Sequence, residues 1–103
     1  MKNNEFTITK DKTPEGVRYT VKGQVNSINA SALQYKLEES LRYGEKRIVL
    51  NMSYVEFLSS AGIRVILKTH KDAVRDGGSF GIEQPSESVR NVLGMAALDE
   101  MLI

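Results

Sequence analysis

The chain has 103 residues, with 14 Lys and Arg against 13 Asp and Glu, and it contains no cysteine. This length suits one compact domain, and the near-neutral charge argues against a nucleic-acid surface, which usually needs a basic excess. The lack of cysteine excludes disulfides and thiolate metal sites. No apolar run approaches the roughly 18 residues of a membrane span, and no secretory signal is visible. We therefore expect one domain over residues 1–103, in the cytoplasm, without membrane insertion.

The first elements expected along the chain are two strands. Residues 6–10 alternate apolar with polar side chains, and residues 17–23 do so again, which is the period of a half-buried strand. Residues 11–16, between them, contain Lys, Thr, Pro, Glu and Gly, a composition typical of a turn. Together these segments predict a β-hairpin with a fairly long loop.

A helix and a strand are expected next. Asn29 is placed to cap a helix that begins at about Ala30 and ends near Gly44. The apolar stripe of this helix consists of Ala30, Leu33, Leu37 and Leu41. Residues 47–52 form a short apolar run with β-branched side chains, which predicts a buried strand.

The last third of the chain predicts two more helices with a strand between them. One helix runs from Ala61 to about Asp76 and stops at the glycine pair 77–78. Its expected apolar stripe consists of Ile63, Ile66, Leu67, His70 and Val74, flanked by Val65 and Ala73. Residues 79–82 follow as a strand, and Ser86 caps a short helix that Gly94 closes. Residues 101–103 are either an end strand or a frayed terminus.

The order β-β-α-β-α-β-α, with a possible last strand, predicts an α/β fold. Strands that alternate with helices pair in parallel within one sheet. We therefore expect a mixed, mostly parallel sheet of four to five strands, with three to four helices packed on it.

The sequence offers little that would support catalysis. His70 is the single histidine, and no HExxH, P-loop or GxGxxG motif is present. The acidic residues are scattered singly, without a clear carboxylate pair. A lone imidazole neither makes a zinc site nor identifies a catalytic triad. We expect a protein that is not an enzyme, with no cofactor and no metal.

Two serines, Ser59 and Ser60, stand where a strand gives way to the second long helix. The simplest interpretation is capping, in which a serine oxygen accepts a hydrogen bond from an amide of the first helical turn. The same position also suits phosphorylation, because a helix start carries partial positive charge and free amides. The two interpretations are compatible, since one serine can cap while the other is modified.

The segment from Phe57 to Val65, FLSSAGIRV, resembles the phosphorylation loop of STAS domains, in which an acidic residue, a phosphorylatable serine, a small residue and a glycine open the second helix. The resemblance covers the chain from about Val17 to the C-terminus. It includes the glycine-led turn at residues 23–26, the central strand at residues 47–53, the glycine pair 77–78 and the third-helix tail at residues 92–99.

This resemblance implies an anti-sigma-factor antagonist. Unphosphorylated, such a protein binds an anti-sigma factor with serine-kinase activity; phosphorylation by that kinase blocks binding, and a PP2C-type phosphatase reverses it. Carried onto this chain, the resemblance implies that Ser60 is the phosphoacceptor. It also implies a phosphorylation loop shaped by Ser59, Ala61 and Gly62, and a partner-binding surface that includes Gln24, Val25, Asn26, Ile63 and Arg64.

The sequence departs from the family pattern at two positions near Ser60. Ser59 stands where many members carry Asp, and Asn26 stands where many carry another acidic residue. Both changes remove negative charge, so they bear on how a kinase recognises the loop and on which serine it modifies. The alternative function is a STAS scaffold or accessory subunit, never phosphorylated, that assembles a signalling or transport complex.

Overall fold

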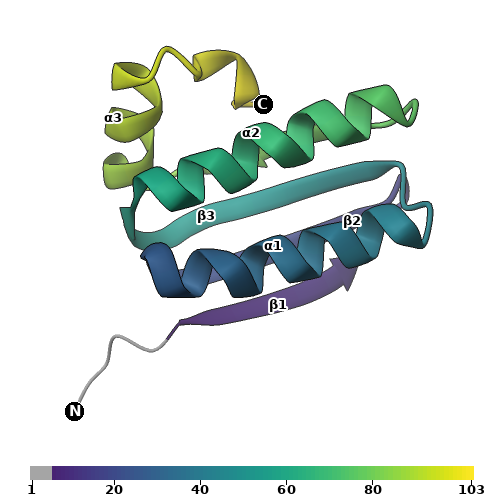
Figure 1. The fold of residues 1–103 in the computed structure, drawn as a ribbon, viewed down its shortest axis with the longest axis horizontal. Helices are drawn as coiled ribbons and strands as arrows, with labels where there is room; N and C mark the ends of the chain where they lie inside the picture. Colours follow the sequence, from purple (N-terminus) through teal and green to yellow (C-terminus); the bar gives the residue numbers. More distant parts are fainter. Residues whose placement is uncertain (1–5) are drawn as a thin grey trace.

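A four-stranded mixed sheet lies at the centre of the computed structural model, which describes residues 6–103 (Figure 1). Its strands, in spatial order, are β1 (Thr7–Lys12), β2 (Val17–Val25), β3 (Arg47–Leu58) and β4 (Ser79–Glu83). β1 pairs antiparallel with β2, whereas β2 with β3 and β3 with β4 pair in parallel. The predicted mixed and mostly parallel sheet is thus confirmed.

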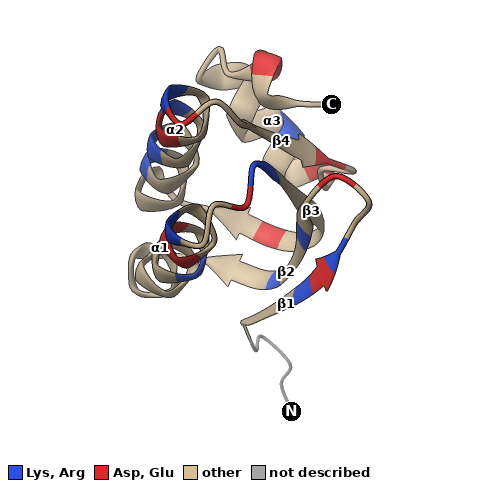
Figure 2. Cartoon of the chain, turned by 90° about the vertical axis from the view of Figure 1, so that its right-hand side faces the viewer, with Lys and Arg blue, Asp and Glu red and all other residues tan. Residues whose placement is uncertain are grey.

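Three α-helices and one short 3-10 helix accompany the sheet: α1 (Ser27–Arg42), α2 (Ser60–Arg75), α3 (Glu87–Met95) and η1 (Asp99–Met101). Parallel strands need long crossover connections, and α1 and α2 supply them. Both helices lie side by side over the same face of the sheet, as Figures 1 and 2 show together. None of the helices within residues 6–103 is long and apolar enough to cross a membrane.

The core lies between these two helices and the sheet. Every second residue of β2 from Val17 to Val25 is buried, and β3 contributes Ile48, Leu50 and Met52, as expected for strands with one covered face. α1 adds Ala30, Leu33 and Leu37, which belong to its predicted stripe. Each of the larger side chains stabilises the fold by about 1.5–3 kcal/mol relative to an exposed position.

The start of α1 differs from the prediction. Asn26, and not Asn29, is the N-cap: its Oδ1 accepts hydrogen bonds from the amides of Ile28 (3.0 Å) and Asn29 (2.8 Å). Asn29 lies inside the first turn and donates to the Gln24 carbonyl. The helix therefore begins three residues earlier than expected. Its predicted end is confirmed, because Gly44 follows the C-cap with a φ of 76°.

The strand β3 is twice as long as the apolar run that predicted it. It continues from Met52 to Leu58, because its second half pairs with β2 up to the Val25–Leu58 pair. The register shifts twice along this pairing, between Thr20 and Lys22 and between Gly23 and Gln24, as occurs at β-bulges. As a consequence, β2 and β3 end side by side, directly before α1 and α2 begin.

The buried face of α2 is rotated relative to the predicted stripe. Ile66 is buried as expected, but Val74 is 55% exposed, and Ile63, Leu67 and His70 are only partly covered. The residues that face the sheet are Gly62, Val65, Ile66, Thr69 and Ala73. This face consists largely of small side chains, so the helix lies close to the strands. The hydroxyl of Thr69 is satisfied by the Val65 carbonyl at 2.8 Å.

The C-terminal third follows the prediction with small shifts. Ser86 caps α3, as expected, by accepting a hydrogen bond from the Val89 amide at 3.2 Å. The helix runs to Met95, one residue beyond the predicted stop at Gly94. Leu102 forms an isolated parallel bridge with Ile82, so the chain end lies beside β4 without making a full strand.

Candidate functional site

Ser59 is the N-cap of α2. Its backbone is extended (φ −81°, ψ 171°), and its hydroxyl accepts a hydrogen bond from the Gly62 amide at 3.2 Å. The Ser59 amide in turn donates to the Val25 carbonyl at 3.0 Å, which ties the helix start to the end of β2. The capping role considered for the serine pair therefore belongs to Ser59.

Ser60 is the first residue of α2 and is exposed to solvent. The helix start does not use its side chain as a cap, because Ser59 fills that role. Amides of the first helical turn have no partner within the helix and carry partial positive charge. The structural hydroxyl is therefore that of Ser59, and the accessible hydroxyl is that of its neighbour, Ser60.

Gly62 sits beneath this pair and has no room for a side chain. A Cβ atom at this position would lie 2.6 Å from Cδ1 of Leu58 and 2.9 Å from Cγ1 of Val25. The glycine therefore lets the first turn of α2 approach the ends of β2 and β3 closely. Ala61, on the other side of the turn, is partly exposed.

The structure brings the predicted partner-binding residues to this end of the molecule, but with different exposure. Gln24 and Asn26 are partly exposed beside Ser59, where β2 leads into α1. Val25, between them, is fully buried, so it contributes by packing beneath Gly62 and does not form part of the surface. This is a correction to the sequence-based surface: the polar neighbours of Val25 face solvent, and Val25 itself does not.

The remaining two predicted residues lie on the first turns of α2. Arg64 is exposed, whereas Ile63 is partly buried and packs against the core. Arg64 lines a groove of about 320 Å³ between the N-terminal halves of α1 and α2. The other lining residues are Ser27, Ala30, Ser31, Gln34, Ala61, Val65 and Lys68.

Sequence reasoning missed the contribution of α1 to this groove. Ser27 and Ser31 lie on its first turns, one helical turn apart, and Ile28 between them is 79% exposed. The signal was present in Asn26, which is a favourable N-cap residue, but Asn29 was predicted to be the cap. If the helix had been predicted to start at Ser27, its first turn would have been expected to lie near Ser59 and Ser60.

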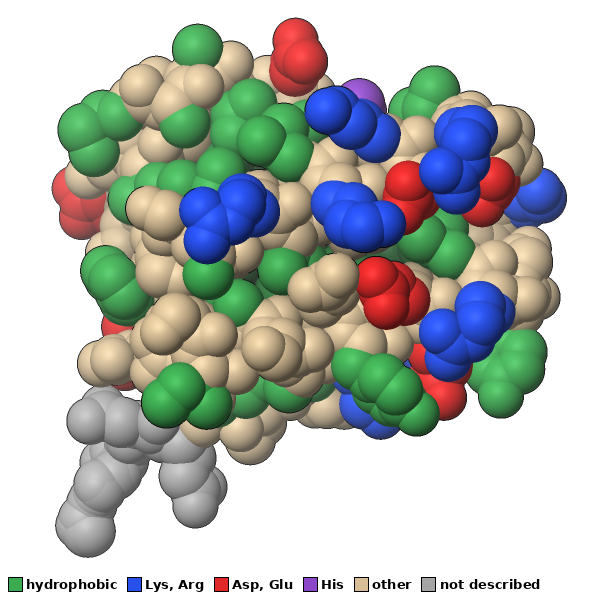
Figure 3. Space-filling model, viewed as in Figure 1, with side chains coloured by type: hydrophobic (Ala, Val, Ile, Leu, Met, Phe, Trp, Pro, Cys, Tyr) green, Lys and Arg blue, Asp and Glu red, His purple; other side chains and the backbone are tan. Residues whose placement is uncertain are grey.

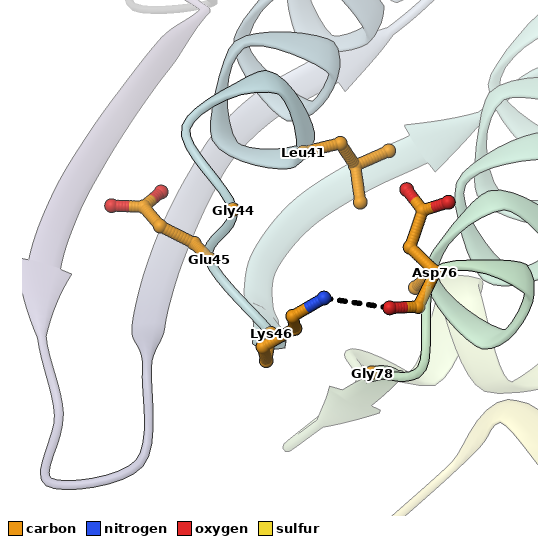
Figure 4. Close-up of a pocket in the computed structure, with 7 residues that line it drawn as sticks. Leu41, Gly44, Glu45, Lys46, Asp76 and Gly78 are labelled. Carbon is orange, nitrogen blue, oxygen red and sulfur yellow. Dashed lines mark hydrogen bonds between the residues drawn. The ribbon is translucent and has the colours of Figure 1, made fainter.

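A second cavity, of about 270 Å³, lies where α1 and α2 end, away from Ser60 (Figure 4). Lys46 donates from Nζ to the Asp76 carbonyl at 2.7 Å across it, and the Glu45 carboxylate points away from it. Within residues 6–103 no group of three or more His, Asp or Glu side chains is arranged to hold a metal ion. The cavity thus presents one lysine that is already bonded, and no converging polar set.

These observations define a class of α/β domain: a mixed sheet with both crossover helices on one face and an accessible serine where the second helix begins. The chain belongs to the STAS domain family, whose pattern matches residues 7–102. It is 33% identical over 85 residues to BtrV of Bordetella bronchiseptica, a candidate anti-sigma factor antagonist, covering 82% of this chain and 73% of the relative.

Two further comparisons extend the likeness. The anti-sigma-F factor antagonist RsfB of Mycobacterium tuberculosis is 25% identical over 81 residues, which are 79% of this chain and 66% of the relative. The solved structure of the Bacillus anti-sigma factor antagonist SpoIIAA in its unphosphorylated form superposes with a TM-score of 0.82 at 19% identity, covering 96% of this chain and 86% of the other. At that identity the superposition shows the shared fold.

Proposed function

We propose that this chain is an anti-sigma-factor antagonist that binds an anti-sigma factor with serine-kinase activity. Membership of the STAS family supports this proposal, as do the names of BtrV and RsfB. The binding surface we propose is the end of the molecule where β2 and β3 finish and α1 and α2 begin. Gln24, Asn26 and Arg64 present polar groups there, Ile63 adds an apolar edge, and Val25 supports the loop from below.

Binding is switched off, in this proposal, by phosphorylation of Ser60. The observation that carries it is the division of labour between the two serines: Ser59 caps α2, while Ser60 is exposed and has no capping role. The Ser60 hydroxyl oxygen attacks the terminal phosphorus of a nucleoside triphosphate on the kinase, which releases the diphosphate and gives up the hydroxyl proton. A PP2C-type phosphatase then hydrolyses the phosphoserine, which restores the serine and releases inorganic phosphate.

A phosphate at this position changes the surface without unfolding the helix. It adds roughly −1.5 to −2 charges at neutral pH, and negative charge is favourable at a helix start. Ser59, Ala61 and Gly62 hold the loop in place during the modification, because the cap and the close packing of Gly62 do not involve the Ser60 side chain. A partner that binds the surface while Ser60 is uncharged would then face a phosphate dianion at that position.

The test is intact-mass analysis of the protein purified from its own host, with and without phosphatase, followed by mapping of the modified residue. We expect one added phosphoryl group on Ser60, absent from the Ser60→Ala variant and retained in Ser59→Ala. A group on Ser59 would contradict the assignment of the site.

Absence of phosphate under growth, starvation and stress would instead favour the scaffold function. One observation points that way: neither Ser59 nor Asn26 supplies negative charge beside Ser60, and both side chains are engaged in capping. The purified anti-sigma factor then separates the two functions. A scaffold binds its partners equally well with serine or phosphoserine at position 60, whereas the switched antagonist does not.

A further inference from the structure

The groove lined by Arg64 adjoins a second hollow between α1 and α2, with which it shares Lys68; we treat the two hollows as the two halves of one groove, and their charges differ. In the half next to Ser60, the charged lining residues are Arg64 and Lys68, and both are basic. The other half is lined by Glu38, Asp72 and Asp76 together with Arg42, Lys68 and Arg75. Figure 3 shows this face, with acidic side chains over the two helices gathered toward their C-terminal halves. The serine half of the groove is therefore positive, while the other half is mixed.

Arg64 differs from the other basic residues of α2 that line the groove. Lys68 pairs with Asp72 at 2.8 Å, and Arg75 pairs with Asp72 at 3.1 Å and with Asp76 at 3.3 Å. Arg64 takes part in none of the five ion pairs found among residues 6–103, and it is exposed. Its guanidinium is thus free to bind an outside anion, and its planar donor fork suits a carboxylate or a phosphate.

Arg64 also lies four residues after Ser60 in the same helix. Side chains at this spacing are neighbours on one helix face, with Cβ atoms roughly 5–6 Å apart. A phosphate on Ser60 would therefore come within reach of the Arg64 guanidinium.

We propose that Arg64 anchors an acidic segment of the partner in the serine half of this groove, and that phosphoserine at position 60 displaces this segment by pairing with Arg64 itself. This inference rests on the proposed function and specifies how its switch works. The carboxylate of the partner and the phosphate compete for one guanidinium. The charge of the phosphate, roughly −1.5 to −2, offsets most of the positive charge of Arg64 and Lys68, so this half of the groove no longer attracts an acidic segment.

The pair is tested without any kinase, by incorporating phosphoserine at position 60 during synthesis and titrating it by phosphorus NMR. A nearby guanidinium favours the dianion, so we expect the second pKa of the phosphate to be lower by about 0.3 units with Arg64 than with Arg64→Gln. Lys71→Gln is the matched control, because Lys71 lies on the same helix roughly 16 Å from position 60 and is also exposed. If the phosphate has the same second pKa in the unsubstituted chain and in the Arg64→Gln variant, phosphoserine at position 60 does not pair with Arg64.

The partner contact is tested with the unphosphorylated protein and the purified host anti-sigma factor. We expect Arg64→Gln to weaken binding about fivefold, Arg64→Glu to weaken it further, and Lys71→Gln to leave it unchanged, with the loss shrinking at high salt. If the anti-sigma factor binds the unsubstituted chain and the Arg64→Glu variant with equal affinity, the proposal that Arg64 anchors an acidic segment of the partner is wrong. If the unsubstituted chain does not bind the anti-sigma factor at all, the proposed function fails, while the phosphoserine titration still decides the pair with Arg64.

Discussion

The two ends of the layer formed by α1 and α2 use their polar side chains in opposite ways. At the end where the helices begin, Ser60 and Arg64 face solvent and have no role in holding the fold together. At the end where α1 finishes, Ser40 is fully buried and forms a hydrogen bond with the hydroxyl of Tyr19, which is itself 1% exposed. A hydroxyl satisfied inside the protein is structural, whereas one left in solvent is available for chemistry.

The buried end forms a connected polar cluster. The Tyr19 hydroxyl also donates to the Lys36 carbonyl at 3.1 Å, and Nζ of Lys10 lies 5.7 Å from the centre of the Tyr19 ring. Nζ of Lys10 also pairs with Oε1 of Glu45 at 3.1 Å. These contacts join β1, β2, α1 and the loop after α1. We therefore expect substitutions at this end to change stability, and substitutions of the exposed residues at the serine end to change binding.

Gly62→Val should give the largest effect, because Gly62 has no room for a side chain and lies directly beneath the serine pair. The added side chain would overlap Leu58 and Val25, and overpacking of this kind typically costs about 1–3 kcal/mol. The free energy of unfolding, measured by urea titration, should fall by that amount, and partner binding should weaken as the helix start moves. Gly94→Ala is the control, since a Cβ there meets only Oδ1 of Asp99 at 3.8 Å. Equal stability of Gly62→Val and the unsubstituted chain would refute the close packing of α2.

Ser59→Ala and Ser60→Ala should separate the structural serine from the accessible one. Loss of an N-cap costs about 1 kcal/mol, so Ser59→Ala should lower the free energy of unfolding by roughly that amount. Ser60→Ala should leave it nearly unchanged, because the Ser60 side chain is exposed and does not cap the helix. Thermal and urea unfolding of both variants check the difference. The reverse order of stabilities would mean that Ser60 is the cap.

Glu45 makes the opposite end sensitive to acid. Burial alone would raise the pKa of Glu45, but its ion pair with Lys10 opposes this effect, and the pKa lies below its usual value. A carboxyl whose pKa is lower in the folded state stabilises the fold above its unfolded-state pKa, and this stabilisation is lost as pH falls through the lowered value. We expect urea midpoints to drop more steeply on acidification for the unsubstituted chain than for Glu45→Gln. If the urea midpoints of the two proteins fall in parallel as the pH is lowered, the pair of Glu45 and Lys10 does not make the fold sensitive to acid.

Much of the fold followed from local patterns in the sequence. The alternation in residues 17–23 identified β2, the stripe from Ala30 to Leu37 identified α1, and Ser86 identified the start of α3, because each of these signals depends on a few neighbouring residues. The serine pair at the start of α2 was also visible, since a strand ends and a helical period begins there.

The misses concern features that depend on distant parts of the chain. β3 extends beyond Met52 to Leu58 because β2 lies beside it and supplies pairing partners, such as Lys22 for Tyr54 and Val25 for Leu58, which no local pattern reveals. The buried face of α2 is set by the small residues Gly62 and Ala73, which let the helix approach the sheet, so hydrophobicity alone gave the wrong rotation. The burial of Val25 likewise depends on the turn that Gly62 permits.

Among these variants, Ser60→Asp should change stability least. It should also show most clearly that a substitution at the serine end changes binding without changing stability. An acidic side chain in the first turn of a helix interacts favourably with its dipole, so the free energy of unfolding should rise by a few tenths of a kcal/mol or stay constant. Partner binding should nevertheless weaken, because the carboxylate places negative charge in the half of the groove where Arg64 and Lys68 lie. Calorimetric titration with the anti-sigma factor, alongside urea unfolding, measures both quantities on one sample. Ser60→Asn, which has nearly the same shape without the charge, should bind more tightly than Ser60→Asp. If the two variants bind equally, the size of the side chain controls binding and its charge does not.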